Sequence, residues 1–523
     1  MSDHDVGAEP DRIASLIYFA LGERRLRDAA DLAEANWAVL VSHNVGVLRA
    51  VADQLTPKEL AERPAWDKLR RLLGFMLLDP SVRPVTYVDT PTPYTPRSIG
   101  DVLLTLTARA VAARTAGRFA EAVEVSRMAQ QRLDEAPHAD RDAIQHRLAD
   151  GYLQWGLSYE FAGLETEALA AYECAYDLGV GFSNTRVATD AAGQLAWLHA
   201  LAGRGPTADE WILKAQTLAG VVRSTRSWRR NDIMASALRQ ADRLRPDLAV
   251  ETMGKRTDGA IDEHRVIAYA QLSMFQLSAG QTTPDLLVSE LRRVVTTVPS
   301  LVAEQNESSV VVAYITALVH LYGGRPERAI GVLGRLTDES ARYTLGVRAA
   351  THLAAGAKAE ALRDADRVIA NYGHWPRQLV PALLVRAVAA LEGGEREAAA
   401  SFFSDACGVA VDKGIVSSLV VVPHADYAQL LALAGERVAD PAIIALGRTP
   451  LLFAPPRRNA VKLSPRELQV LRELAHGGTL AEVAGRLHLS LNTLKVHNQA
   501  IYRKLGVDGR DQAIDAARVR GLL

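Results

Sequence analysis

AGRFAEAV, residues 116–123, recurs along the chain as AGLETEAL (162–169), GGRPERAI (323–330), AGAKAEAL (355–362) and GGEREAAA (393–400), with a weaker copy, AGRGPTAD, at 202–209. In each copy a glycine is followed, five positions later, by an alanine. A glycine readily adopts the left-handed conformation that ends a helix, and an alanine lets the next helix pack closely on its predecessor. The phrase therefore predicts helix hairpins.

The spacing of these glycines indicates a repeat architecture. Gly117, Gly163 and Gly203 are 46 and 40 residues apart, and Gly324, Gly356 and Gly394 are 32 and 38 apart. Periods of about 34 to 47 residues are typical of stacked two-helix repeats. With aromatic residues at only 6% and little period-two alternation, the pattern predicts an all-α protein whose residues 1–446 form an α-solenoid of tetratricopeptide-like hairpins.

Proline and charge divide the chain further. Two stretches with three prolines each, residues 86–100 and 447–462, are predicted linkers, because proline lacks a backbone donor and restricts its predecessor. From Arg457 onward, 12 Lys and Arg face 6 Asp and Glu, a net charge of +6. The first 456 residues carry 48 basic and 55 acidic residues, a net charge of −7. We therefore expect a basic, nucleic-acid-binding domain at residues 463–523, after a linker at 447–462.

The remaining composition indicates a cytoplasmic protein. Cys174 and Cys407 are 233 positions apart, which argues against a disulfide framework or a zinc cluster. The N-terminus is polar and lacks the basic and apolar regions of a signal peptide. The longest stretch without Asp, Glu, Lys or Arg, residues 308–324, is shorter than the ~20 residues needed to cross a bilayer. It is predicted to be a buried helix, and no membrane partner is expected.

The C-terminal segment contains three helix-start signals. Ser464-Pro465-Arg466-Glu467 is a capping box with proline at the first helical position, and Gly477-Gly478 should end the helix that it starts. Thr479-Leu480-Ala481-Glu482 is a second capping box, for a helix ending near Leu487. Ser490 is predicted to cap a third helix to about Leu505. Two short helices joined by a tight turn at His488-Leu489-Ser490 predict a helix-turn-helix.

Angular positions at 100° per residue separate the faces of the third helix. Its inner stripe contains Leu494, Asn498, Ile501 and Leu505. The opposite face contains Asn492, Lys495, Val496, Gln499 and Arg503. Lysine and arginine bind phosphate or guanine, glutamine or asparagine can pair with adenine, and valine can contact a thymine methyl. This face therefore predicts binding to double-stranded DNA.

The run LSPRELQVLRELAHGGTLAEVAGRLHLSLNTLKVHNQAIYRKLGVDGRDQAI, residues 463–514, closely resembles the LuxR-type DNA-binding domain of bacterial transcription regulators. The resemblance implies a four-helix unit whose third helix enters the major groove. It implies base contacts by Lys495, Val496 and Gln499, and phosphate contacts by Thr479, Ser490, Thr493 and Arg503. The helix at 511–519 would be the family's dimer contact, with Ile514, Ala517 and Arg518 as candidates; alternatively it covers only the core of its own domain.

The segment also departs from the family's pattern. Asn498 stands where the core stripe usually has an apolar residue, and Leu480-Ala481 replaces a polar pair at the start of the second helix. A second resemblance covers residues 29–69, which look like the helical segment after the ATPase of the large ATP-binding LuxR regulators related to the maltose-system activator. This chain begins after the point where that ATPase would end, so we expect regulation without ATP.

The repeat region is expected to act as a sensor. Four aromatic residues, Trp155, Tyr159, Trp197 and Trp211, are candidates for a ligand pocket, although such residues more often pack in a core. We find no phosphate-binding glycine loop, HExxH, GxSxG or dinucleotide fingerprint, and predict no catalytic residue, no metal site and no cofactor. The sequence thus predicts a transcription regulator with an unknown small-molecule effector, or alternatively one controlled by a protein partner.

Overall fold

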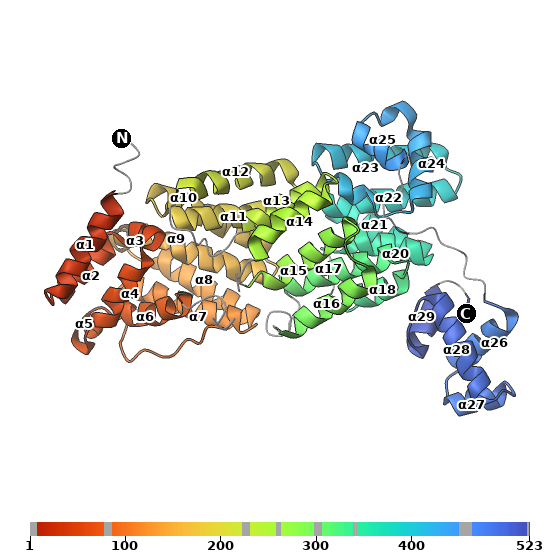
Figure 1. Ribbon diagram of the computed structural model, residues 1–523, viewed down its shortest axis with the longest axis horizontal. Coiled ribbons are helices and arrows are strands. Elements are labelled where there is room, and N and C mark those ends of the chain that lie inside the picture. The colour runs from red at the N-terminus through yellow and green to blue at the C-terminus, as the bar shows by residue number, and fades with distance from the viewer. Residues whose placement is uncertain are drawn as a thin grey trace.

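The computed structural model describes residues 8–77, 86–221, 231–257, 263–297, 306–337, 340, 343–448, 455, 463–519 and 522–523. These residues form helices and connecting turns without a β-strand, which confirms the predicted all-α class (Figure 1). The N-terminal helices are α1 Ala8–Gly22, α2 Leu26–Ala35, α3 Trp37–His43, α4 Val45–Gln54, α5 Pro57–Glu62 and α6 Ala65–Met76.

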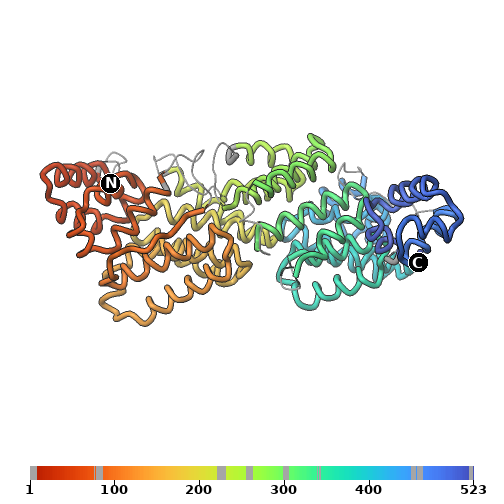
Figure 2. The backbone as a smooth tube through the Cα atoms, turned by 90° about the horizontal axis from the view of Figure 1, so that it is seen from below, coloured from red at the N-terminus to blue at the C-terminus, as the bar shows by residue number. Residues whose placement is uncertain are grey.

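A superhelix of hairpins follows (Figures 1 and 2). Its first half contains α7 Ile99–Thr115, α8 Phe119–Glu135, α9 His138–Phe161, α10 Glu165–Gly181, α11 Thr185–Ala202, α12 Gly205–Val221, α13 Asn231–Asp242, α14 Pro246–Thr257, α15 Arg265–Ser278 and α16 Pro284–Thr297. Its second half contains α17 Glu307–Tyr322, α18 Pro326–Leu333, α20 Leu345–Ala355, α21 Lys358–Asn371, α22 Pro376–Glu392, α23 Arg396–Asp412, η2 Val416–Leu419, α24 His424–Ala434, η3 Gly435–Arg437 and α25 Pro441–Arg448. The uncharged run at 308–324 is the mostly buried α17, as predicted.

The repeated phrase explains these hairpins. All six of its glycines have positive φ, from 69° at Gly324 to 86° at Gly203, and a helix starts two residues after each one. The six alanines five positions after these glycines are fully buried; they are Ala122, Ala168, Ala208, Ala329, Ala361 and Ala399. The predicted roles of both residue types are therefore confirmed, while the tetratricopeptide-like subtype stays a prediction.

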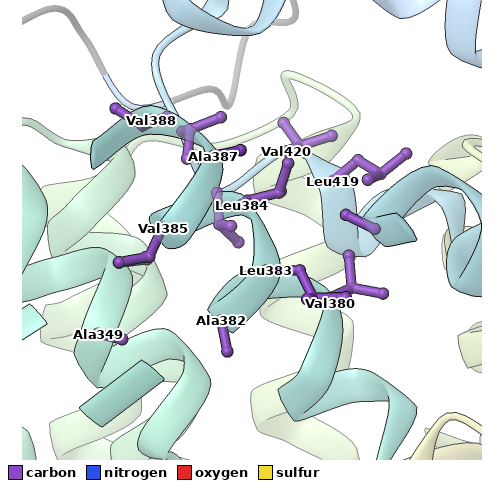
Figure 3. Close-up of a cluster of buried hydrophobic side chains, with 14 of the residues drawn as sticks. Ala349, Val380, Ala382, Leu383, Leu384, Val385, Ala387, Val388, Leu419 and Val420 are labelled. Carbon is purple, nitrogen blue, oxygen red and sulfur yellow. The ribbon is translucent and has the colours of Figure 1, made fainter. Parts of the chain in front are cut away.

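Three hydrophobic clusters hold the region together. The first joins α1 to α6, with Ile17, Leu48 and Val51 fully buried. The second extends from Leu103 to Val319, and the third from Ala317 to Leu446. Figure 3 shows the centre of the third, where residues 380–388 of α22 pack against Leu419 and Val420. The two halves of the superhelix thus have separate cores that meet at α17.

The predicted linkers lie where helices end. Residues 86–97 are described and contain no helix, and α7 begins at Ile99. Helix α25 includes the first two residues of the second predicted linker, Gly447 and Arg448. The rest of that segment, apart from Pro455, is outside the described residues. The C-terminal domain follows as α26 Pro465–Ala475, α27 Leu480–Arg486, α28 Leu491–Leu505 and α29 Arg510–Val519.

Candidate nucleic-acid interface

Side-chain caps set the starts of the three helices that build this interface. Ser464 and Thr479 each accept a hydrogen bond from the backbone of the glutamate three residues on, forming two complete capping boxes. Ser490 accepts from the backbone N–H of Thr493 at 3.1 Å. The turn between α27 and α28 places His488 at φ 51°. The three predicted caps and the helix-turn-helix are therefore confirmed.

The predicted inner stripe of α28 is buried. Leu494, Ile501 and Leu505 are fully enclosed, in one cluster with Val470 and Leu471 of α26. Asn498 also faces inward and is 5% exposed. Its Oδ1 atom has no hydrogen-bond partner within the described part of the chain. The core of this domain therefore contains a polar atom whose hydrogen-bonding capacity is unmet.

The opposite face of α28 is open to solvent. Exposed residues there include all five predicted outward residues: Asn492, Lys495, Val496, Gln499 and Arg503. Val496, at 64%, and Leu491, at 47%, are unusually exposed for apolar side chains. Thr479, Ser490 and Thr493 are exposed at the starts of α27 and α28, where free backbone N–H groups favour phosphate. The sequence reasoning missed Leu491, whose position directly after the capping serine was the available signal.

Several other basic residues of the domain bind within it. Arg466 donates to the carbonyl of Leu487 at 3.0 Å, and Arg486 pairs with Glu473 at 2.7 Å. Arg510 donates to the carbonyl of Leu474. These contacts tie the turns of the helix-turn-helix together. The net positive charge therefore overstates the number of cations that are free to bind DNA.

A further internal contact, between Lys504 and Glu467, lowers the pKa of the Glu467 carboxyl. Lys504 binds the Glu467 carboxylate at 2.6 Å. The hydrogen bond from Lys504 lowers the pKa of Glu467, and hydrogen bonds from Ser464 lower it further. Glu467 therefore stays ionised and keeps both the N-terminal cap of α26 and the end of α28 in place.

The predicted dimer helix is α29. Ile514 is half-buried, whereas Ala517 has no exposed surface and packs in the core of its own domain. The side chain of Arg518 is outside the described residues. A dimer contact through α29 would thus rest on Ile514 and its exposed neighbours. Helix α29 also covers the core, so the two roles weighed for it are compatible.

Residues 461–517 match the family "Bacterial regulatory proteins, luxR family". Over 61 residues the chain is 39% identical to the "Probable transcriptional regulatory protein NarL" of two Mycobacterium tuberculosis strains, CDC 1551 / Oshkosh and ATCC 25618 / H37Rv. That match covers 12% of this chain and 28% of each relative. The C-terminal domain is therefore a LuxR-family DNA-binding domain of a transcription regulator. The match does not reach the repeat region.

The four candidate ligand-pocket aromatics do not share one pocket. Tyr159 donates its hydroxyl to Gln130 at 2.7 Å, and Trp197 donates to Glu307 at 3.3 Å. Trp211 stacks edge-on with Tyr176, with centroids 5.0 Å apart. Of the four, Trp155 lines a cavity of the repeat region, and the other three do not line it.

That cavity, of about 230 Å³, is enclosed mainly by α3, α6, α7 and α9. Its apolar walls include Trp37, Trp66, Leu103, Leu104 and Trp155. Charged residues that line it pair with each other, as three arginine–carboxylate contacts illustrate: Arg114–Glu263 at 2.6 Å, Arg147–Glu34 at 3.3 Å and Arg186–Asp150 at 2.8 Å. The cavity thus suits a mainly apolar, uncharged molecule.

Among the described helices, none is long and apolar enough to span a membrane.

Proposed function

We propose that this chain is a sequence-specific transcription regulator whose helical-repeat region senses an uncharged small molecule and controls the C-terminal domain. The observation that carries the sensing role is the 230 Å³ cavity, with its apolar wall and self-compensated charges. Pockets of this kind bind small molecules by burying apolar surface, with a few polar groups fixing orientation. Three tryptophans, Trp37, Trp66 and Trp155, line it and offer an optical signal for binding.

In the DNA complex, α28 enters the major groove. Lys495, Val496 and Gln499 contact base edges, because they lie on its solvent-facing side. Phosphate contacts come from Thr479, Ser490, Asn492, Thr493 and Arg503. One recognition helix reads only a few base pairs, so two copies bind an inverted repeat with half-sites about one helical turn apart. Sedimentation of the complex at saturating protein measures this stoichiometry.

Salt titration of DNA binding tests the interface as a whole. Each neutralised phosphate releases counterions, so with about 3 to 5 phosphate contacts the slope of log K against log salt is near −3 to −4.5 per protomer. We expect this slope for the full chain and for residues 457–523, which have a hydrophobic core of their own. A slope near zero, or a fragment unable to bind where the full chain binds, contradicts the proposal.

A filled cavity tests the sensing role. Leu104→Trp adds bulk to the cavity wall and should abolish the effector's influence on operator affinity while leaving effector-free DNA binding intact. Leu213→Trp is the control, because Leu213 of α12 is 65% exposed and lies outside the cavity. Candidate effectors come from the genes bound in genome-wide immunoprecipitation. Binding should not require ATP, and ATP-dependent DNA binding by the purified chain would contradict this account.

Control by a protein partner, in place of a small molecule, is the second candidate function, and one observation favours it. On α1, Leu16 and Phe19 lie on one face with 47% and 60% of their surface exposed. Exposed apolar residues at helical spacing are typical of protein interaction surfaces. A Leu16→Ser, Phe19→Ser double variant that loses regulation while the cavity still binds its effector would favour this candidate.

A further inference from the structure

A second cavity in the repeat region adjoins a cluster of three ionisable side chains. Glu160 is near the end of α9, His264 directly precedes α15, and Glu307 is the first residue of α17. One ligand atom from each lies within 4.8 Å of the other two. His264 Nε2 is 2.7 Å from Glu160 Oε1, and both side chains are completely buried. The three residues come from separate parts of the superhelix, and only its folding brings them together.

Two atoms of this cluster have unmet hydrogen-bonding capacity. Glu307 Oε1 accepts from Trp197 at 3.3 Å, and the Glu307 carboxyl also contacts the carboxyl of Glu160. Within the described part of the chain, no donor reaches Glu307 Oε2, and His264 Nδ1 has no hydrogen-bond partner. Both atoms are shielded from solvent. The hydroxyl of Tyr172 donates to the remaining oxygen of Glu160, Oε2, and so holds that carboxylate in place. A buried polar atom without a partner is unfavourable, which makes it a signal for a missing ligand.

The charges around the cluster favour a cation. Two acidic side chains, Glu160 and Glu307, lie beside each other in this cluster. The adjoining cavity, of about 200 Å³, is lined by both glutamates and by Glu165. Glu165 pairs with Arg204 at 3.0 Å, and the cavity's own arginine, Arg377, is bound to a buried aspartate. Within the described residues, no arginine or lysine forms a salt bridge with Glu160 or Glu307.

We propose that Glu160, His264 and Glu307 bind a divalent transition-metal cation such as Zn²⁺ through two carboxylate oxygens and one imidazole nitrogen. Imidazole together with carboxylate suits zinc and its neighbours better than magnesium or calcium, which prefer oxygen alone. Ligands bound at about 2.0 to 2.2 Å lie within roughly 4.4 Å of one another, so atoms up to 4.8 Å apart need only small side-chain shifts.

Binding of a cation would replace the hydrogen bond between His264 and Glu160, and the adjoining cavity leaves a coordination position open to water or a ligand. Because the ligands belong to α9, the start of α15 and α17, the cation would clamp three segments of the superhelix. The sequence predicted no metal site, since the ligands are 104 and 43 residues apart, and this proposal runs against that expectation.

Calorimetric titration of the chelator-treated full chain with zinc chloride tests the site. We expect one equivalent to bind, and Glu307→Gln, which keeps the shape of the side chain, to weaken binding at least about tenfold. His264→Gln should do the same. His352→Gln is the matched control, because His352 also contacts a buried carboxylate, that of Asp364 at 3.0 Å, and lies outside the cluster. Equal affinity of the wild type and Glu307→Gln would overturn the proposal, as would an absence of binding.

A spectroscopic measurement on the wild-type chain covers the case in which the variants do not fold. X-ray absorption at the zinc edge should show a first shell of nitrogen and oxygen with the scattering of one imidazole. Binding at the exposed His138–Asp142 pair on α9 could imitate this signal, so the measurement is repeated with His138→Gln. A shell without imidazole, or a signal lost in His138→Gln, would overturn the proposal.

Discussion

The charged side chains of the C-terminal domain and those of the helical-repeat region differ in their burial and in their partners. In the C-terminal domain, Arg486 and Arg510 remain near the surface and bind carbonyl oxygens of nearby turns. In the repeat region, complete ion pairs are buried between helices far apart in sequence. Arg114 and Glu263 are 149 residues apart and 2.6 Å from each other, and Arg377 and Asp242 are 135 residues apart and 2.8 Å from each other.

This difference indicates which part of the molecule can respond to a signal. The small domain is held together by one apolar core. The repeat region depends on buried charges at junctions between its helices, where removal of one partner leaves the other uncompensated. A ligand or cation that alters such a junction can shift the equilibrium between superhelix conformations, to the extent that it binds them unequally.

The largest expected effect is at the junction of Arg377 and Asp242. Arg377 of α22 binds both oxygens of Asp242 at 2.8 Å and joins the two halves of the superhelix. Arg377→Met should lower the free energy of unfolding by about 3 to 5 kcal/mol, because the buried Asp242 loses its main partner. Urea denaturation measures this. Arg386→Met, on the same helix but one-third exposed, should change stability by about 1 kcal/mol or less.

A double variant sharpens the interpretation of that result. Arg377→Met combined with Asp242→Leu replaces the pair with apolar side chains and should recover much of the lost stability. Equal losses in the single and double variants would show that the charge of Asp242 is not the cause.

The next effect is on DNA binding. Lys495→Ala and Gln499→Ala should each weaken operator binding by about 1 to 3 kcal/mol without unfolding the domain, because both side chains are exposed on α28. Competition between operator and random DNA measures the loss of discrimination. Arg472→Ala removes the same charge from α26 as Lys495→Ala removes from α28, but it should leave discrimination unchanged. Full discrimination by Lys495→Ala would contradict the assigned base contact.

A smaller effect, an increase in stability, is expected from a substitution in the core of the C-terminal domain. Asn498→Leu should raise the stability of residues 457–523 by about 1 to 2 kcal/mol, because it replaces a buried polar atom without a partner by an apolar side chain with the same branching. Thermal denaturation of the fragment measures it. Gln499→Leu, at the exposed neighbouring position, should change stability by less than about 0.5 kcal/mol. Destabilisation by Asn498→Leu would indicate that Asn498 has a partner in solution.

A last effect on stability, at His320, appears only in acid. Burial, with help from Arg325 and Arg328, lowers the pKa of His320 to about 4, whereas an unfolded chain has a value of about 6.5. The unfolded state therefore binds this proton first, and the stability contributed by neutral His320 declines as the pH falls from about 6.5 to 4. Denaturation at pH 7.5 and pH 5 should show a smaller decline for His320→Gln. His138→Gln, at an exposed site on α9, should behave as the wild type does.

Local chemistry explains why so much of the fold was predictable. The hairpin turns follow from glycines with positive φ, and the helix starts of the C-terminal domain follow from Ser464, Thr479 and Ser490. The outward and inward faces of α28 follow from helical periodicity, which held at every residue that was placed. Each of these features depends on residues within one or two helical turns, which a sequence displays directly.

The aromatic candidates illustrate where such reasoning ends. Trp155 and Tyr159 lie one turn apart on α9, yet only Trp155 lines the large cavity, while Tyr159 binds Gln130. A sequence shows that both residues face inward. It does not show which of them lines a cavity and which packs against other side chains. That outcome depends on how α3, α6 and α7 pack around α9.

By itself, the sequence determined that the chain is all-helical, where its hairpins turn, and that its basic C-terminal domain resembles the LuxR-type DNA-binding domain and exposes one polar face of its third helix. Only the tertiary structure decided which buried groups meet: the wall of the cavity, the Arg377–Asp242 junction and the cluster of Glu160, His264 and Glu307. The physical reason is that helix signals act over a few residues. These contacts instead join residues of different helices, up to 149 positions apart, whose distance depends on the accumulated packing of every helix between them.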